Sequence, residues 1–189
     1  MRSTWRPGRS VRANQREQGC PLPGDDLISQ PIETLTHAIT IGRPPSAVWP
    51  WLVQMGAGSR AGWYSYDMLD NGHRPSATRV VPELQEIASG SVFPALPGIK
   101  EGFILQAFIP RRFLVLGWPT PDGQVLVSWT FVLQQVGAGS TRLIVRVRAQ
   151  QGYRFQGLPT WLSRPLVRVV HFVMQRKQLL GIAQRAESC

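Results

Sequence analysis

A long C-terminal segment with helical periodicity limits the folds open to this chain of 189 residues. From about Pro165 to Glu187, apolar and polar residues recur at the spacing of an amphipathic α-helix. The polar arc comprises Arg168, His171, Gln175, Gln178 and Arg185, and the opposite, apolar arc comprises Leu166, Val169, Val170, Val173, Met174 and Leu180. We expect the apolar arc to lie against a concave sheet. Arg176 and Lys177 fall inside or beside that arc, so they either reach solvent at its edge or face a pocket.

Alternating apolar residues predict the sheet itself. Leu35, His37, Ile39 and Ile41 alternate with polar or small residues, which is typical of a half-buried strand. Turn signals then separate six further short strands, centred near Val80, Val92, Leu105, Val115, Phe131 and Val145. Val125, Val127, Trp129, Phe131 and Leu133 form one bulky side of the penultimate strand, while Leu143, Val145 and Val147 alternate with Arg142, Ile144, Arg146 and Arg148 in the last one. We expect the arginine side to face water, and residues 137–140 to form a hairpin turn.

Two short helices are predicted between the first strand and the meander. Pro44 and Pro45 end the strand and open a helix that carries apolar residues at helical spacing and stops at Gly56. Pro50 inside it costs a backbone hydrogen bond or forces a kink. Ser65 can cap a second short helix that runs through Leu69.

The first 33 residues differ from the rest of the chain. They carry five arginines and several prolines and glycines, with no apolar periodicity, so we expect a basic, largely disordered leader (1–33) whose last part lies across the domain. Residues 34–189 are predicted to form a single ligand-binding domain. Cys20 and Cys189 form no disulfide framework or metal spacing. With no secretory or membrane-spanning segment in the sequence, a cytoplasmic location is expected.

The formal net charge of +10 raises the question of a polyanionic partner. The arginines are scattered over leader, strands and final helix, and no zinc-finger, helix-turn-helix or RNA-recognition pattern accompanies them. We therefore expect no specific nucleic-acid partner. Weak contact of the basic leader with an anionic membrane stays open, as does the oligomeric state.

The segment Gly62–Asp67 puts three aromatic rings and a carboxylate into a glycine-flanked connection. Such rings belong either to the packed core or to the mouth of a ligand cavity, and we expect the cavity mouth. The predicted ligand-binding residues are Trp63, Tyr64, Tyr66 and Asp67 at the rim, Trp129 and Phe131 on the sheet, Met174 and Lys177 on the final helix, and Arg74 and His37. Lys177 or Arg74 could pair with a carboxylate or phenolate of the ligand.

Nothing in the sequence identifies a catalytic or metal site. The three histidines lie outside any nucleophile motif, His73 in a turn, His171 on a polar helix arc and His37 on an apolar strand face. There is no metal-ligand spacing, and no metal or organic cofactor is expected. Whether the protein is an enzyme is left open.

Several local patterns resemble the START-related SRPBCC superfamily. Residues 36–41 followed by 44–49 resemble its opening strand and the proline-rich start of its first helix, and residues 128–133 with 139–143 resemble its last two strands. Residues 62–67 and 171–177 look like those of a bacterial branch of this superfamily, and the similarity covers about 34–187. The resemblance implies an α+β helix-grip fold, in which a curved antiparallel sheet wraps around a long C-terminal helix, with two short helices after the first strand and a deep apolar cavity.

Three functions remain open from the sequence. The protein could bind a small hydrophobic ligand of lipid, polyketide or aromatic type between the sheet and the final helix. It could be a cyclase, aromatase or dehydratase acting in the same cavity, with Tyr64, Tyr66, Asp67 or His37 transferring protons. It could be a scaffold or membrane-surface protein acting through its basic leader and arginine strand.

Overall fold

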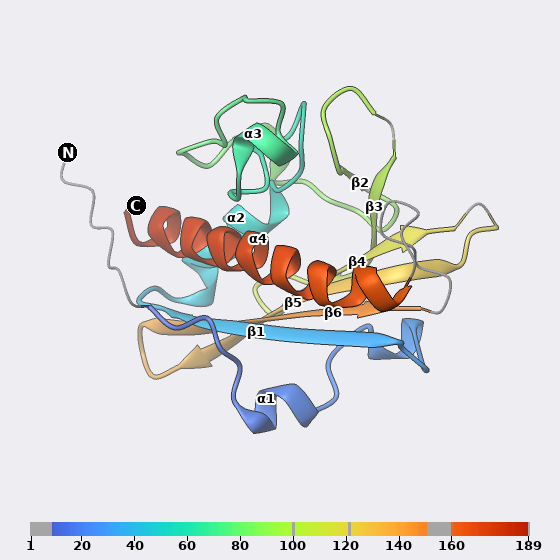
Figure 1. Cartoon of the computed structure of the whole chain (residues 1–189). Helices are drawn as coiled ribbons and strands as arrows, with labels where there is room; N and C mark the ends of the chain where they lie inside the picture. The colour runs from blue at the N-terminus through green and yellow to red at the C-terminus, as the bar shows by residue number, and fades with distance from the viewer. Residues whose placement is uncertain (1–8, 100, 121, 151–159, 189) are drawn as a thin grey trace.

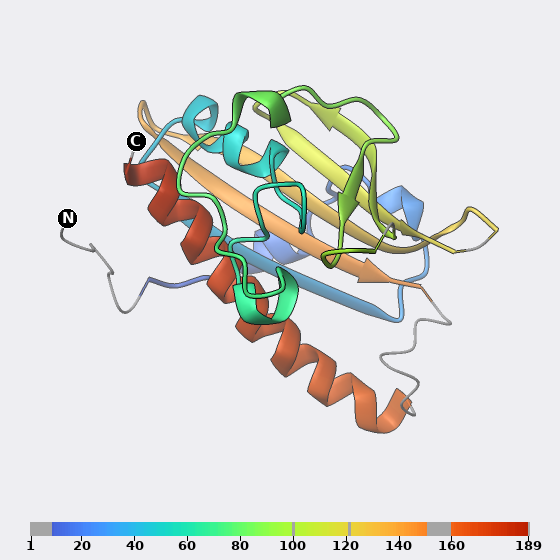
Figure 2. The same ribbon diagram turned by 90° about the horizontal axis from the view of Figure 1, so that it is seen from above.

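The computed structural model describes residues 9–99, 101–120, 122–150 and 160–188, with only the backbone for 160–167. Six strands form one antiparallel sheet in the order β1-β6-β5-β4-β3-β2. Their bounds are β1 Glu33–Ile41, β2 Val92–Pro94, β3 Gly102–Ile109, β4 Phe113–Pro119, β5 Val125–Val136 and β6 Ser140–Ala149. The long helix α4, Thr160–Ser188, crosses one face of this sheet (Figures 1 and 2). The expected α+β helix-grip fold is thereby confirmed.

The strand predictions are correct except at one position. The hairpin at 137–139 joins β5 and β6, where Phe131 pairs with Val145 and Trp129 with Val147. Phe131, Leu133, Leu143 and Val145 enter the main core, as the alternation predicts. The strand expected near Val80 is absent from the described chain, because Val80 lies in a loop that leads into a short 3-10 helix, Pro82–Leu84.

Two short helices lie between β1 and β2. α2, Pro45–Val53, has Pro45 in its first turn and Pro50 inside, and it buries Val48, Trp51, Leu52 and Val53. α3 is the single turn Asp67–Asp70. Its N-cap is Tyr66, without a side-chain cap, because the Ser65 hydroxyl donates to the carbonyl of Met174 on α4 instead (3.1 Å). This bond ties the loop before α3 to the long helix.

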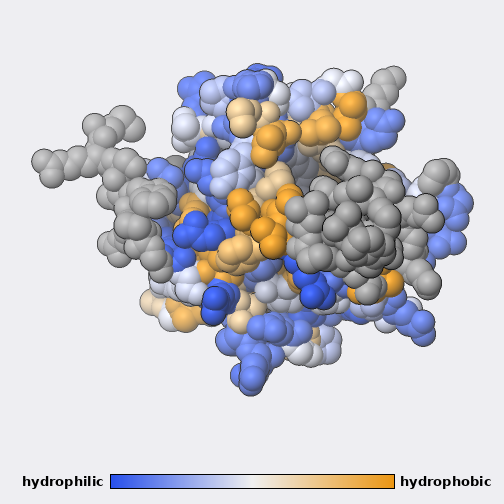
Figure 3. Space-filling model, in the orientation of Figure 1, coloured by the Kyte–Doolittle hydropathy of each residue, from blue (hydrophilic) through white to orange (hydrophobic). Residues whose placement is uncertain are grey.

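The rotation of α4 about its axis differs from the expected one. Gln175 and Gln178 of the predicted polar arc are buried, whereas Val169 and Val173 of the predicted apolar arc are exposed. The C-terminal half of the helix sets this rotation, because Leu179, Ile182, Ala183 and Ala186 pack into the main core. Figure 3 shows apolar surface on the face of the molecule that carries α4. The exposed large apolar residues of α3 and α4 are Met68, Leu69, Val169, Phe172 and Val173. The side chain of Leu166 lies outside the described residues.

Residues 9–32 cross the outer face of the sheet, on the side opposite α4 (Figure 1). They include α1, Gln15–Gly19, closed by a capping box between Asn14 and Glu17, and a 3-10 helix, Asp25–Leu27. Ala13 and Leu22 pack with Ala38 and Ile144 in a second small core. The sequence predicts a largely disordered leader, whereas residues 9–32 contain helical turns and buried side chains. Residues 1–8 lie outside the described part of the chain.

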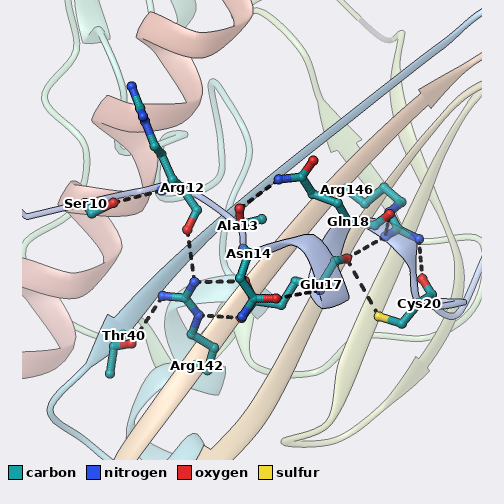
Figure 4. Close-up of polar contacts among 10 residues, drawn as sticks. All are labelled: Ser10, Arg12, Ala13, Asn14, Glu17, Gln18, Cys20, Thr40, Arg142 and Arg146. Atoms are coloured by element: carbon teal, nitrogen blue, oxygen red, sulfur yellow. Dashed lines mark hydrogen bonds and ion pairs between the residues drawn. The ribbon is translucent and has the colours of Figure 1, made fainter.

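The arginine side of β6 contacts this leader and does not face water, which corrects the expectation. Arg146 has a side chain only 4% exposed and donates to Asp25 (2.7 Å) and to the carbonyls of Glu17, Gln18 and Cys20. Arg142 makes two hydrogen bonds to the Glu17 carboxylate, at 2.7 and 2.9 Å (Figure 4). Arg142 lowers the pKa of Glu17 first through these hydrogen bonds, and burial opposes the shift. The alternation in β6 is therefore real, but both of its sides are covered.

No helix in the described part of the chain combines the length and the apolar character needed to cross a membrane.

Candidate functional site

A cavity of about 270 Å³ lies between the sheet and α4. Its walls come from the loop after α2, from α3, from β3, β5 and β6, and from the first described turns of α4. The lining residues are Trp63, Ser65, Asp70, Ala95, Phe103, Val127, Trp129, Val147, Val170, His171, Met174, Gln175 and Gln178. Most of this wall is apolar, and the polar groups stand on α3, on the loop before it and on α4. Apolar walls with a few polar groups are the usual make-up of a small-molecule site.

Three aromatic rings form one wall of the cavity. Trp63 and Trp129 stack with ring centroids 5.3 Å apart and an interplanar angle of 21°. Phe103 meets Trp129 at 5.2 Å and Trp63 at 6.1 Å, the latter edge to face. The indole N–H of Trp63 donates to the carbonyl of Pro94 at 3.1 Å, which fixes the ring although its backbone belongs to a loop. The wall is rigid because each ring is held by the other two and by a strand.

A chain of hydrogen bonds connects this aromatic wall to α4. The indole N–H of Trp129 donates to Oε1 of Gln175 at 3.2 Å, and Nε2 of Gln175 donates to Oε1 of Gln178 at 2.8 Å. Gln178 Nε2 lies 3.8 Å from the sulfur of Met55, a weak acceptor. These contacts explain why two glutamines are tolerated on the buried side of the helix, because buried polar groups need partners.

Asp70 is the acidic residue of the cavity wall. Its side chain is buried, and in the described part of the chain neither carboxylate oxygen has a partner at hydrogen-bonding geometry. Burial, and next the charge of Asp67, raise the pKa of Asp70 to about 6, while nearby backbone amides and the Ser65 hydroxyl act in the opposite direction. Among the described lining residues, Asp70 is the only one with a formal charge at neutral pH. A buried and unpaired carboxylate is costly, so its position in a cavity indicates a functional group.

Two histidines meet at the sheet side of α4. His171 lines the cavity, and its ring stacks on that of His37 at 5.5 Å and 26°. Burial, and next the neighbouring His37, lower the pKa of His171 to about 4, and burial also lowers the pKa of His37. His37 Nε2 and His171 Nδ1 are buried, and no described residue offers either of them a hydrogen bond. The rotation of α4 thus turns His171, which the sequence places on a polar helix arc, toward the sheet and the cavity.

The three aromatic side chains predicted to form the rim lie in three different places. Trp63 lines the cavity. Tyr64, in a left-handed conformation with φ of 59°, is buried behind α4 against Trp51 and under the Arg185 guanidinium. Tyr66 is 38% exposed. Its ring lies 6.0 Å from the Lys177 ammonium.

The other predicted binding residues are also separated by the fold. Trp129 and Met174 line the cavity, whereas Phe131 packs behind Trp129 in the core at 5.1 Å. His37 lies behind His171. Asp67 accepts hydrogen bonds from the amide and hydroxyl of Ser76, and Arg74 donates to the carbonyl of Gly58 (2.8 Å). Neither Arg74 nor Lys177 lines the cavity, so the cationic groups expected to meet an anionic ligand lie elsewhere.

Several lining residues were not among the predicted ones. Val127 belongs to the bulky side of β5, a signal that marks an inward side but not a cavity, and Phe103, between Gly102 and Ile104, has no alternation that marks its side. The polar character of Asp70, Gln175 and Gln178 suggests exposed positions, because polar residues on short or amphipathic helices are usually solvated. The sequence holds no sign that they line a cavity.

No protein-family model matches the sequence, and comparison with curated proteins gives no match. One solved structure does show the fold. The Zhui aromatase/cyclase from Streptomyces sp. R1128 is similar with a TM-score of 0.50 and 13% identity, over 82% of this chain and 93% of that one. Protein MLL2253 from Mesorhizobium loti has a TM-score of 0.47 and 16% identity, over 82% of this chain and 97% of that one. At such identities the likeness extends to the fold alone, which is the fold that the START-related resemblance implied.

Proposed function

We propose that this protein binds a small hydrophobic molecule, of lipid, polyketide or aromatic type, in the cavity between the sheet and α4. The observation that carries the proposal is the cavity of about 270 Å³ with its wall of three aromatic rings. Apolar surface of this kind gains free energy when a ligand removes it from water, by about 25 cal/mol for each Å². The similar aromatase/cyclase supports the same proposal, since such an enzyme is named for chemistry that yields an aromatic product.

The binding proposal is tested by filling the cavity. Val147 lines it from β6, so Val147→Trp places a large side chain where the ligand would lie. Val136→Trp, at an exposed position on β5, adds the same group outside the cavity and serves as the control. With the neutral fluorophore prodan as probe, we expect a blue-shifted emission for the wild type and Val136→Trp, and none for Val147→Trp. Prodan emission unchanged by the wild-type protein would contradict the proposal.

Native mass spectrometry addresses the ligand more directly. Protein purified from its own host should carry a small molecule in the wild type and in Val136→Trp, and lose it in Val147→Trp. A molecule that stays with Val147→Trp would lie outside the cavity.

A second function, a cyclase, aromatase or dehydratase, is favoured by one specific pair of residues. Asp70 and His171 line the same cavity, and their environments move their pKa values in opposite directions, to about 6 and about 4. Strongly perturbed titratable groups in one cavity, here with the carboxyl at the higher pKa and the imidazole at the lower one, are a common sign of acid-base chemistry. An Asp70 carboxylate can accept a proton from a carbon next to a carbonyl, leaving an enolate in the cavity.

This second function is tested by proton exchange. The methyl protons of acetophenone in D₂O should exchange faster with the wild-type protein than with Asp70→Asn. Tyr66→Phe should keep the wild-type rate, because Tyr66 lies on the outer surface. Exchange no faster than in buffer alone would leave ligand binding as the function.

A further inference from the structure

We infer that the ligand is a hydrophobic amine, whose ammonium group pairs with Asp70 while its apolar body lies against Trp63, Phe103 and Trp129. The inference rests on the proposed binding function and names the chemical class that the cavity would take. The charges of protein and ligand are the reverse of those expected from the sequence, in which a cationic side chain of the protein would pair with an anionic group of the ligand.

The first support is the state of Asp70. Its carboxylate is buried in the cavity wall, and neither oxygen has a hydrogen-bond partner among the described residues. Buried charges in proteins are normally paired, because removing a carboxylate from water without compensation is costly. Among the described residues that line the cavity there is no lysine or arginine to provide the missing charge. An ammonium group on the ligand would supply both the opposite charge and the hydrogen-bond donors.

The second support is the aromatic wall. The faces of aromatic rings attract cations, and clusters of such rings are a common means of binding ammonium groups. In the described part of the chain, the protein's own cations lie over other rings: Arg60 over Phe93, Lys177 over Tyr66 and Arg185 over Tyr64. Trp63, Phe103 and Trp129 have no such partner there. The cavity thus combines an apolar wall with a negative group and lacks a competing cation from the described residues.

The charges around Asp70 favour a cationic ligand over an anionic one. Asp67, on the same helical turn, adds a second negative charge that Asp70 senses. On the opposing helix, His171 is held neutral above a pKa of about 4, and Gln175 and Gln178 are uncharged. The Lys177 ammonium lies 6.0 Å from the Tyr66 ring, outside the lining of the cavity. β3, β5 and β6 contribute only apolar side chains to this wall, so an acid entering the cavity would meet repulsion without compensation.

Three probes of one shape separate the ligand classes. Tryptamine, tryptophol and indoleacetate share an indole ring with a short tail and differ in the head group, which is an ammonium, a hydroxyl or a carboxylate. By isothermal titration calorimetry at pH 7.5, we expect tryptamine to bind at least about tenfold more tightly than tryptophol, and indoleacetate to bind most weakly. Tryptamine affinity should fall at pH 5, below the pKa of about 6 of Asp70, while tryptophol affinity stays level.

Two matched variants assign the preference to Asp70. Asp70→Asn keeps the shape but removes the charge, so tryptamine should lose its advantage while tryptophol still binds, which also shows that the variant is folded. Asp67→Asn makes the same change in net charge on the same helix, at a residue that contacts Ser76 and does not line the cavity. It should keep the preference for tryptamine and extend it to lower pH, since one cause of the raised pKa of Asp70 is removed.

The outcomes distinguish this inference from the function on which it rests. Equal binding of all three probes, tightest binding of indoleacetate, or a tryptamine preference that survives Asp70→Asn would overturn the amine ligand and leave the cavity as a hydrophobic site. If neither prodan nor any of the three probes binds the wild type, the binding function falls together with it.

Discussion

The Arg146 guanidinium donates a 2.7 Å hydrogen bond to the Asp25 carboxylate, so the last strand of the sheet is joined to a segment 121 residues earlier in the chain. The same guanidinium donates to three carbonyls around the end of α1. The leader therefore covers the outer face of the sheet through a buried charge and not only through its small apolar core.

Arg146→Ala should destabilise the protein strongly. The substitution removes the donor of the three carbonyls and one of the two arginine partners of Asp25, which keeps Arg148 at 3.2 Å. Breaking a buried ion pair from one side costs about 3–5 kcal/mol, and we expect a loss toward the lower end of this range. Arg168→Ala is the matched control, because Arg168 also pairs with a carboxylate, that of Glu33, but its side chain is 61% exposed. We expect chemical denaturation to give a large loss for Arg146→Ala and a nearly unchanged free energy of unfolding for Arg168→Ala. A free energy of unfolding as little changed in Arg146→Ala as in Arg168→Ala would mean that the leader contacts are not stabilising.

Gly181→Ala should destabilise the protein although alanine is the better helix former. A Cβ at residue 181 would lie 2.4 Å from the carbonyl oxygen of Tyr64, so α4 must move away from that loop. We expect a loss of about 1–3 kcal/mol in the free energy of unfolding, against the gain of up to about 1 kcal/mol that helix propensity alone would give. Gly139→Ala, in the β5–β6 hairpin with open space around it, should be close to neutral. A stabilised Gly181→Ala would show that the close approach of α4 to the loop is not needed.

The pH dependence of stability should reveal opposite contributions of Asp70 and His171. The pKa of Asp70 is raised from 3.8 to about 6 by folding, so the folded state binds its proton more tightly and stability falls as the pH rises through this window. The pKa of His171 is lowered from 6.5 to about 4, so the unfolded state binds its proton more tightly and stability rises with pH between these values.

Asp70→Asn removes the first contribution. Relative to the wild type it should be more stable at pH 7.5 than at pH 4, with a change of roughly 1–3 kcal/mol between the two. His171→Gln should show the reverse trend, with its largest relative gain at acidic pH. Denaturation curves recorded at both pH values check the signs, and a difference independent of pH in either variant would rule out the assigned cause.

Tyr64→Phe should leave the free energy of unfolding and the binding of prodan almost unchanged. The Tyr64 hydroxyl is buried and has no partner at hydrogen-bonding geometry within the described ranges, and burial raises its pKa above the ordinary value of a tyrosine. Removing an unpaired buried hydroxyl should change the free energy of unfolding by less than about 1 kcal/mol and leave prodan binding intact. Tyr64→Ala should cost about 3–5 kcal/mol, because it opens a void between Trp51 and Arg185. Loss of prodan binding in a folded Tyr64→Phe variant would mean that Tyr64 takes part in ligand binding, as the sequence predicts.

The elements whose pattern is local were predictable from the sequence. The alternation through Phe131 and Val145 gives both the strands and the side that enters the core, and the resemblance to START-related proteins supplies their order. The rotation of α4 was not predictable, because it depends on contacts made in the folded state. Gln175 looks like a solvated residue until Trp129 is placed against it. The burial of Arg146 is similar, since a distant segment covers it.

The candidate site was predicted only in part, and the reason lies in the backbone of residues 62–67. Alternation in an extended loop would put Tyr64 and Tyr66 together on the side opposite Trp63. In the structure the left-handed conformation of Tyr64 and the bond from Ser65 to Met174 break this alternation, so that Tyr64 is buried while Tyr66 lies at the surface. Asp70 reaches the cavity wall because α3 follows directly after this loop, and no pattern in the sequence predicts that position.

The hydrogen bond from the Trp129 indole to Gln175 has a consequence for detecting ligands. The donor belongs to the sheet and the acceptor to the helix that closes the cavity, so a guest that tilts the ring must loosen a link between two layers of the fold. The indole proton of Trp129 is therefore an internal spectroscopic reporter. Its nuclear magnetic resonance should shift when the cavity fills, without any label attached to guest or host.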